Sequence, residues 1–122
     1  RQVVGDVQGA FDAPLLRRAL SNLLGNATRY ARPGSIVQVG FKAMEEDRVL
    51  ITVTNCGDMI DPEILPHFFD RFFRADPARS HGQSNHGLGL AIVGAIARMH
   101  QGKPVAWSDS GVTSVGMEIS AN

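Results

Sequence analysis

The chain has 122 residues, a length that fits one domain around one hydrophobic core. Its 12 basic and 12 acidic residues balance, which argues against nucleic acid or an anionic membrane surface as the partner. The single cysteine, Cys56, excludes an internal disulfide and favours a reducing compartment. No apolar run approaches the roughly 20 residues needed to span a bilayer, so we expect this stretch not to be membrane-inserted.

The first elements expected are one or two short strands in residues 2–11 and a helix that follows them. Asp12 is a suitable N-cap, and Pro14 fits the first turn. The apolar spacing continues to about Ala31, where the sequence Arg-Pro-Gly ends the helix. The sequence begins at Arg1 in strand-like residues without an initiator methionine, and we expect it to be a piece of a longer protein.

The rest of the chain alternates between strand and helix patterns. Residues 35–44 and 47–55 alternate as two strands of a hairpin, and 103–120 predict a second hairpin that turns near Gly111. The pattern therefore predicts an α+β domain, with a mixed sheet of about five strands and about three helices on one face. Between the hairpins we expect a short aromatic helix over 67–73, a polar loop over 74–86 and a helix over 87–100.

The sequence HGLGLAIV, residues 86–93, places two glycines at the start of that last helix. A dinucleotide fingerprint would need a buried strand directly before Gly87 and a third glycine at the proper spacing, and both are missing. The helix start can nevertheless offer unpaired N–H groups to an anion. We expect the apolar stripe of the helix to be core: Leu88, Ile92, Ala95, Ile96 and Met99.

A polar stripe runs along the first helix. Asn22, Asn26 and Arg29 recur at i, i+4 and i+7, and they share an arc of about 60°. Asparagine is a mediocre helix former, and this stripe borders the apolar face instead of open solvent. A purely structural explanation of the stripe is that water molecules bridge the two asparagine amides. A functional explanation is that amide oxygens help to ligate Mg²⁺ while the arginine meets phosphates.

Four motifs in order resemble the catalytic ATP-binding domain of bacterial sensor histidine kinases, which has the two-layer Bergerat (GHKL) fold shared with gyrase and Hsp90. NLLGNATRYA resembles the N box, NCGDMI the first glycine box, FFDRFFRAD the F box and HGLGLAIV the second glycine box. The resemblance covers nearly the whole chain, 1–122. Within the family, the F box and the asparagine that starts the first glycine box most resemble the heavy-metal sensor subgroup.

The resemblance implies that ATP and Mg²⁺ are bound, with Asn26 as the metal ligand. Asn55 stands where the family usually has an aspartate that accepts a hydrogen bond from the adenine amino group, and Met59 replaces a glycine. These two departures predict a modest affinity and a reduced selectivity for adenine. The other nucleotide-binding residues implied are Asn22, Arg29, Tyr30, Gly57, Ile60, Phe73, Gly87, Leu88, Gly89, Leu90 and Thr113.

By the same resemblance, residues 74–86 form the ATP lid, and Arg74 at its base is the catalytic residue that approaches the γ-phosphate. The phosphoacceptor histidine of the family lies in a separate dimerisation domain of the same receptor. None of the four histidines here has the expected context.

The implied function is therefore transfer of the γ-phosphate of Mg·ATP to that histidine, in a homodimeric receptor that serves a response regulator. The implied location is the cytoplasmic part of an inner-membrane receptor. A Bergerat-type ATPase and a degenerate interaction module are the alternatives. The ATPase relatives carry a glutamate base on the N-box helix, whereas no acid follows Asp12 on this one.

Overall fold

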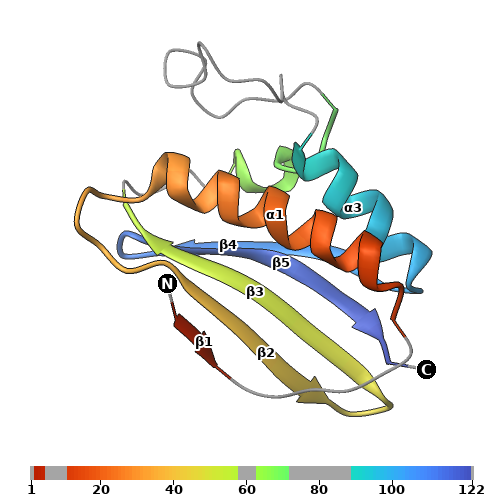
Figure 1. Ribbon diagram of the computed structural model, residues 1–122. Helices are drawn as coiled ribbons and strands as arrows, with labels where there is room; N and C mark the ends of the chain where they lie inside the picture. The colour runs from red at the N-terminus through yellow and green to blue at the C-terminus, as the bar shows by residue number, and fades with distance from the viewer. Residues whose placement is uncertain (1, 5–10, 58–62, 72–88, 122) are drawn as a thin grey trace.

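The computed structural model describes residues 2–4, 11–57, 63–71 and 89–121, and in these the chain forms two layers. Figure 1 shows a twisted sheet with the helices gathered on one face. The elements in chain order are β1 (Gln2–Val4), α1 (Ala13–Tyr30), β2 (Gln38–Met44), β3 (Arg48–Cys56), the 3₁₀ helix η1 (Leu65–His67), α3 (Gly89–Met99), β4 (Lys103–Asp109) and β5 (Val112–Ser120). The α+β class, with helices on one face of the sheet, is as expected.

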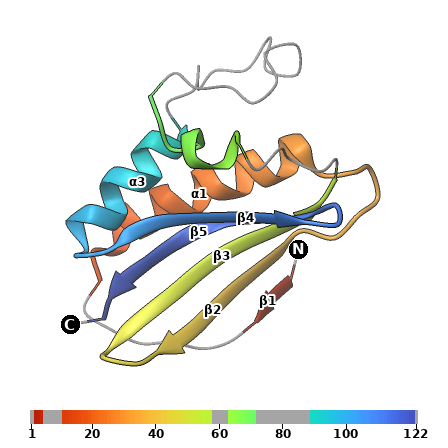
Figure 2. The same ribbon diagram turned by 180° about the vertical axis from the view of Figure 1, so that it is seen from behind.

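The sheet has five strands in the order β1-β2-β3-β5-β4. The short β1 runs parallel to β2, and every other neighbouring pair is antiparallel, so the sheet is mixed. Both predicted hairpins are present. Figure 2 shows from behind that β1 and β4 are the two edges, with β3 and β5 in the centre beneath the helices.

The core lies between the central strands and the two helices. Burial alternates along β3, so that one side chain in two points to the helix layer. On β5 the buried apolar residues are likewise two positions apart: Val115, Met117 and Ile119. Residues from four elements meet there: Ala19, Leu23 and Ala27 of α1, Val49, Ile51 and Val53 of β3, Val93, Ile96 and Ala97 of α3, and Val115, Met117 and Ile119 of β5.

Helix α1 begins and ends where the sequence predicts. The Asp12 side chain accepts a hydrogen bond from the Leu15 N–H at 3.0 Å, which is an N-cap. At the other end Ala31 is extended, and Pro33 and Gly34 follow in a turn. Among the described residues no helix is both long and apolar enough to cross a membrane.

Two expectations about the helical layer were wrong. The buried face of α3 is made by Gly89, Val93, Gly94, Ile96 and Ala97, whereas Ala95 is exposed and Met99 is 65% exposed. The core face is therefore rotated from the predicted stripe, because α3 packs against both α1 and the sheet.

The short helix also differs from the expectation. Instead of an α-helix from His67, the described residues show η1 and then turns through Arg71. Pro66 supplies no N–H, and the bonds present close tighter turns: the N–H groups of Phe68 and Asp70 donate to carbonyls three residues earlier. The buried Phe68 anchors this segment to the core.

His100 joins the end of α3 to the start of α1. The Asp12 N–H donates to its Nε2 at 3.2 Å, and its Nδ1 lies 2.9 Å from the Ile96 carbonyl oxygen. Because a carbonyl only accepts, Nδ1 is the donor in this second bond. The Phe11 ring lies beside it, with ring centroids 6.5 Å apart.

We expect His100→Ala to lower the free energy of unfolding by about 1–2 kcal/mol, because a helix-terminal N–H loses its acceptor and Phe11 loses a packing partner. Urea unfolding followed by circular dichroism measures the change. The matched control is His67→Ala, since that histidine and its partner Asp70 are both exposed, and the change should alter stability by no more than about 0.5 kcal/mol. Equal losses in the two variants would contradict the bridging role.

Candidate functional site

The helix-facing side of the sheet changes from apolar to polar at one end. Along β3 the buried series Val49, Ile51, Val53 continues with Asn55, which is 4% exposed. Thr113 is the cross-strand partner of Asn55 and is also buried. Ser108 pairs with Thr113 in the β4–β5 ladder, and their hydroxyl oxygens lie 2.9 Å apart. We call Asn55, Ser108 and Thr113 the polar end of the sheet.

Backbone contacts at Gly57 position the polar end beside the last turn of α1. The Gly57 N–H donates to the Gly111 carbonyl at 2.8 Å, and Gly57 also forms an isolated bridge with Ala31. A Cβ on Gly57 would overlap the Tyr30 carbonyl oxygen, so only glycine allows this approach. Gly111 has φ +82° and Ser110 has φ 53°, as a two-residue hairpin turn requires.

The asparagine stripe of α1 borders this end, and its three members have different surroundings. Asn26 is 8% exposed, and no described residue hydrogen-bonds its side chain. Asn22 is half-buried, and its Nδ2 donates to the Gly89 carbonyl at 3.2 Å. Arg29 Nε is the one buried side-chain polar atom in the described parts of the chain that lacks a hydrogen-bond partner. A buried guanidinium N–H without a partner is unfavourable until an anion reaches it.

The bond from Asn22 fixes the start of α3 against the stripe. Gly89 is buried, and Leu90 is half-buried as the second residue of the helix. The first N–H groups of a helix have no partner within it, and the positive end of the helix dipole lies there. The structure therefore places the start of α3, a helix end of the kind that can receive an anion, beside Asn22 and one helical turn from Asn26.

The donor set suits a metal held mainly through phosphates. In the described residues no group of three or more His, Cys, Asp or Glu is placed to hold a metal ion. The amide of the buried Asn26 offers a neutral oxygen, a ligand type that Mg²⁺ accepts while it keeps waters and phosphate oxygens. Asn26 and Arg29 thus fit an Mg²⁺·nucleotide complex better than a free metal ion.

Several predicted site residues lie outside the described residues: Arg74, Met59, Ile60, Phe73, Gly87, Leu88 and the expected lid over 74–86. The structure brings together the others. Asn55 and Thr113 come from strands β3 and β5, and Gly57 directly follows β3. Asn26, Arg29 and Tyr30 come from α1, and the start of α3, Gly89 and Leu90, is held against α1 through Asn22.

Sequence reasoning missed Ser108. Its membership of the polar end follows from the hairpin register, which pairs it with Thr113. The signal was present, because a two-residue turn at Ser110 and Gly111 fixes that pairing once both strands are recognised.

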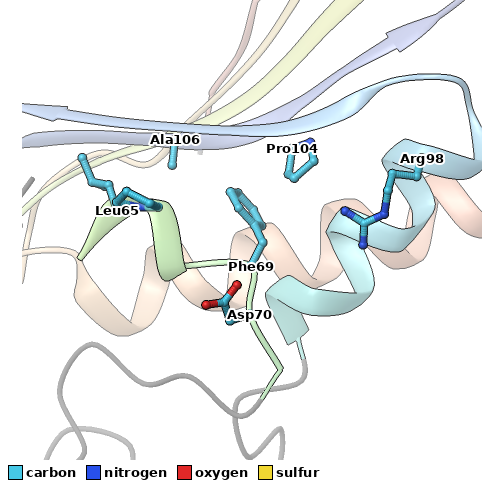
Figure 3. Close-up of a pocket in the computed structure, with 7 residues that line it drawn as sticks. Leu65, Phe69, Asp70, Arg98, Pro104 and Ala106 are labelled. Carbon is cyan, nitrogen blue, oxygen red and sulfur yellow. The ribbon is translucent and has the colours of Figure 1, made fainter. Parts of the chain in front are cut away.

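A separate hollow of about 530 Å³ lies between η1, α3 and the edge strand β4. Figure 3 shows the Phe69 ring pointing at the strand between Pro104 and Ala106, with the Arg98 guanidinium reaching in from α3. Apolar residues line it together with two charged ones, Asp70 and Arg98. No predicted nucleotide-binding residue that the structure describes lines this hollow.

Comparison with known proteins decides the family. Residues 11–120 match the family model described as histidine kinase-, DNA gyrase B- and HSP90-like ATPase. The chain belongs to this ATPase family. The matched range contains both the polar end of the sheet and the asparagine stripe.

Among curated members of this ATPase family, the sensor histidine kinase CusS of Escherichia coli O157:H7 is 46% identical over 110 residues, which are 89% of this chain and 23% of that protein. The sensor histidine kinase TrcS of Mycobacterium tuberculosis is 46% identical over 106 residues, 84% of this chain and 21% of that one. The chain thus spans less than a quarter of these relatives. A solved structure of full-length ShkA in complex with AMPPNP matches with a TM-score of 0.79 and 25% identity, over 96% of this chain and 24% of that one.

A paired glycine substitution tests the close approach at Gly57. We expect Gly57→Ala to lower the free energy of unfolding by about 2 kcal/mol or more, because the added Cβ must displace the end of α1. Gly25→Ala is the control, since its Cβ meets nothing within 4 Å on an exposed face of the same helix. That change should raise stability by about 0.5–1 kcal/mol. A tolerated Gly57→Ala in thermal unfolding would contradict the contact.

Proposed function

We propose that this chain binds Mg²⁺·ATP at the polar end of the sheet and delivers the γ-phosphoryl group to a histidine of a separate domain of the same receptor. The observation that carries the proposal is the buried Nε of Arg29, which lacks a hydrogen-bond partner among the described residues and lies one turn beyond the buried Asn26. Membership of the ATPase family and the AMPPNP complex of ShkA support it.

Each described residue then has a part in holding the nucleotide. Asn26 gives its amide oxygen to Mg²⁺, and Arg29 donates to a phosphate. Leu90 and the residues before it on α3 offer backbone N–H groups to the phosphates. Asn55 and Thr113 face the base, beside Gly57 and Tyr30. Mg²⁺, when bound, neutralises charge on the phosphates.

In the transfer step a ring nitrogen of the acceptor histidine attacks the γ-phosphorus. A P–N bond forms, the bond to the β–γ bridging oxygen breaks, and ADP leaves. Arg74, outside the described residues, is the group we assign to stabilise charge on the transferring phosphoryl. The acceptor histidine and the carboxylate base beside it belong to the separate phosphoacceptor domain.

The wider assignment rests on the relatives, which are sensor histidine kinases. We propose that the parent receptor is a homodimer in the inner membrane, that this domain lies on its cytoplasmic side, and that the phosphoryl group passes on to a cognate response regulator. The F box and the first glycine box support a heavy-metal sensor as the parent. The balanced charge supports a partner other than nucleic acid.

Calorimetric titration tests the metal ligand. Wild type should bind ADP and a non-hydrolysable ATP analogue with an affinity that rises when Mg²⁺ is added. Asn26→Ala should lose that Mg²⁺-dependent gain, whereas Ser21→Ala, an exposed change on the same helix, should keep it. An unchanged titration in folded Asn26→Ala would remove Asn26 as a ligand. No binding of any nucleotide at millimolar concentration would instead favour a degenerate interaction module.

A turnover assay separates the kinase from an ATPase. Because α1 carries no acid after its N-cap, the isolated chain should hydrolyse ATP at no more than the background rate. Joined to its phosphoacceptor domain, it should form acid-labile phosphohistidine from radiolabelled ATP. Steady hydrolysis by the isolated chain would favour the ATPase alternative.

A further inference from the structure

The polar end of the sheet carries no ionisable side chain among its described members. Asn55 contributes an amide, and Ser108 and Thr113 contribute hydroxyls. The Asn55 side chain is 4% exposed, and no described residue hydrogen-bonds it.

The amide and the hydroxyls can reverse their hydrogen-bonding roles. A carboxylate only accepts, whereas an amide presents an oxygen that accepts and an NH₂ group that donates, and it exchanges them by turning about one bond. Either hydroxyl of the Ser108–Thr113 pair, 2.9 Å apart, can be the donor. The Asn55 amide therefore presents no fixed donor or acceptor pattern to a ligand.

This reversibility matters for purine recognition, because purines differ at the atoms that such a residue reads. A 6-aminopurine donates through its N6 amino group and accepts at N1. A 6-oxopurine accepts at O6 and donates at N1. A carboxylate facing the 6-position accepts from the amino group and repels the oxo group, since two acceptors then meet. An amide satisfies either edge after a half-turn.

We infer that Asn55 makes this nucleotide site accept both 6-amino and 6-oxo purine nucleotides, so that residue 55 sets base selectivity. The inference rests on the proposed function, since it assumes that a nucleotide base lies against Asn55. It does not depend on the metal ligand or on the transfer step.

ADP and inosine diphosphate are the appropriate probes, because they differ only at the 6-position and N1. In calorimetric titrations with Mg²⁺, wild type should bind the two with dissociation constants within about tenfold of each other. Asn55→Asp should still bind ADP, and its dissociation constant for inosine diphosphate should be about tenfold or more above that for ADP. The matched control is Gln38→Glu, which makes the same amide-to-acid change on an exposed side chain of β2. It should leave the wild-type ratio unchanged.

The outcomes separate this inference from the proposed function. Wild type that prefers ADP by more than about thirtyfold overturns the inference and leaves nucleotide binding in place. An Asn55→Asp variant that circular dichroism shows to be folded, and that keeps the wild-type ratio of the two dissociation constants, also overturns the inference and leaves nucleotide binding in place. Failure of wild type to bind either diphosphate overturns both proposals. Similar affinities in wild type with a widened ratio only in Asn55→Asp support the inference.

Discussion

The close approach between the end of β3 and the last turn of α1 is the constraint on which the candidate site depends. Gly57 lies against the Tyr30 carbonyl with no room for a Cβ, and its N–H holds the β4–β5 turn through Gly111. These contacts bring the polar end of the sheet beside the asparagine stripe. Without them, Asn55 and Asn26 would be polar groups at the edges of two unrelated elements.

The site depends as much on the polarity and charge of the groups that face it as on these backbone contacts. The inner face of the sheet is apolar along most of β3 and β5 and becomes polar at Asn55 and Thr113. The buried Nε of Arg29 adds a positive group without an internal partner. A neutral base-facing end and a cationic phosphate-facing edge together match an anionic ligand with an uncharged ring.

Much of this arrangement could be predicted from the sequence, since it follows from local chemistry. The cap at Asp12, the Pro-Gly stop after α1 and the tight turn at Gly111 were predicted from residue type, and the structure confirms them. The asparagine stripe was visible because a helix repeats every 3.6 residues. The family then followed from four motifs in order.

What the sequence could not give depends on contacts between distant elements. The bond from Asn22 to Gly89 joins residues 67 positions apart, and no local pattern predicts it. The prediction for the core face of α3 was wrong because Ala95 and Met99 fit the apolar period. In the structure, packing against α1 and the sheet buries Val93 and Ala97 instead. Ser108 can be assigned to the site only when the register of β4 against β5 is known, since that register pairs it with Thr113.

The central claim is that the nucleotide sits between the asparagine stripe and the polar end. Chemical-shift mapping of the ¹⁵N-labelled chain during titration with Mg²⁺ and AMPPNP tests it most directly. We predict that the largest changes fall on the amides of Asn26, Arg29, Asn55, Leu90 and Thr113, with the side-chain amides of Asn26 and Asn55 among them. Changes centred on the hollow around Phe69 and Arg98, with these residues unmoved, would contradict the account.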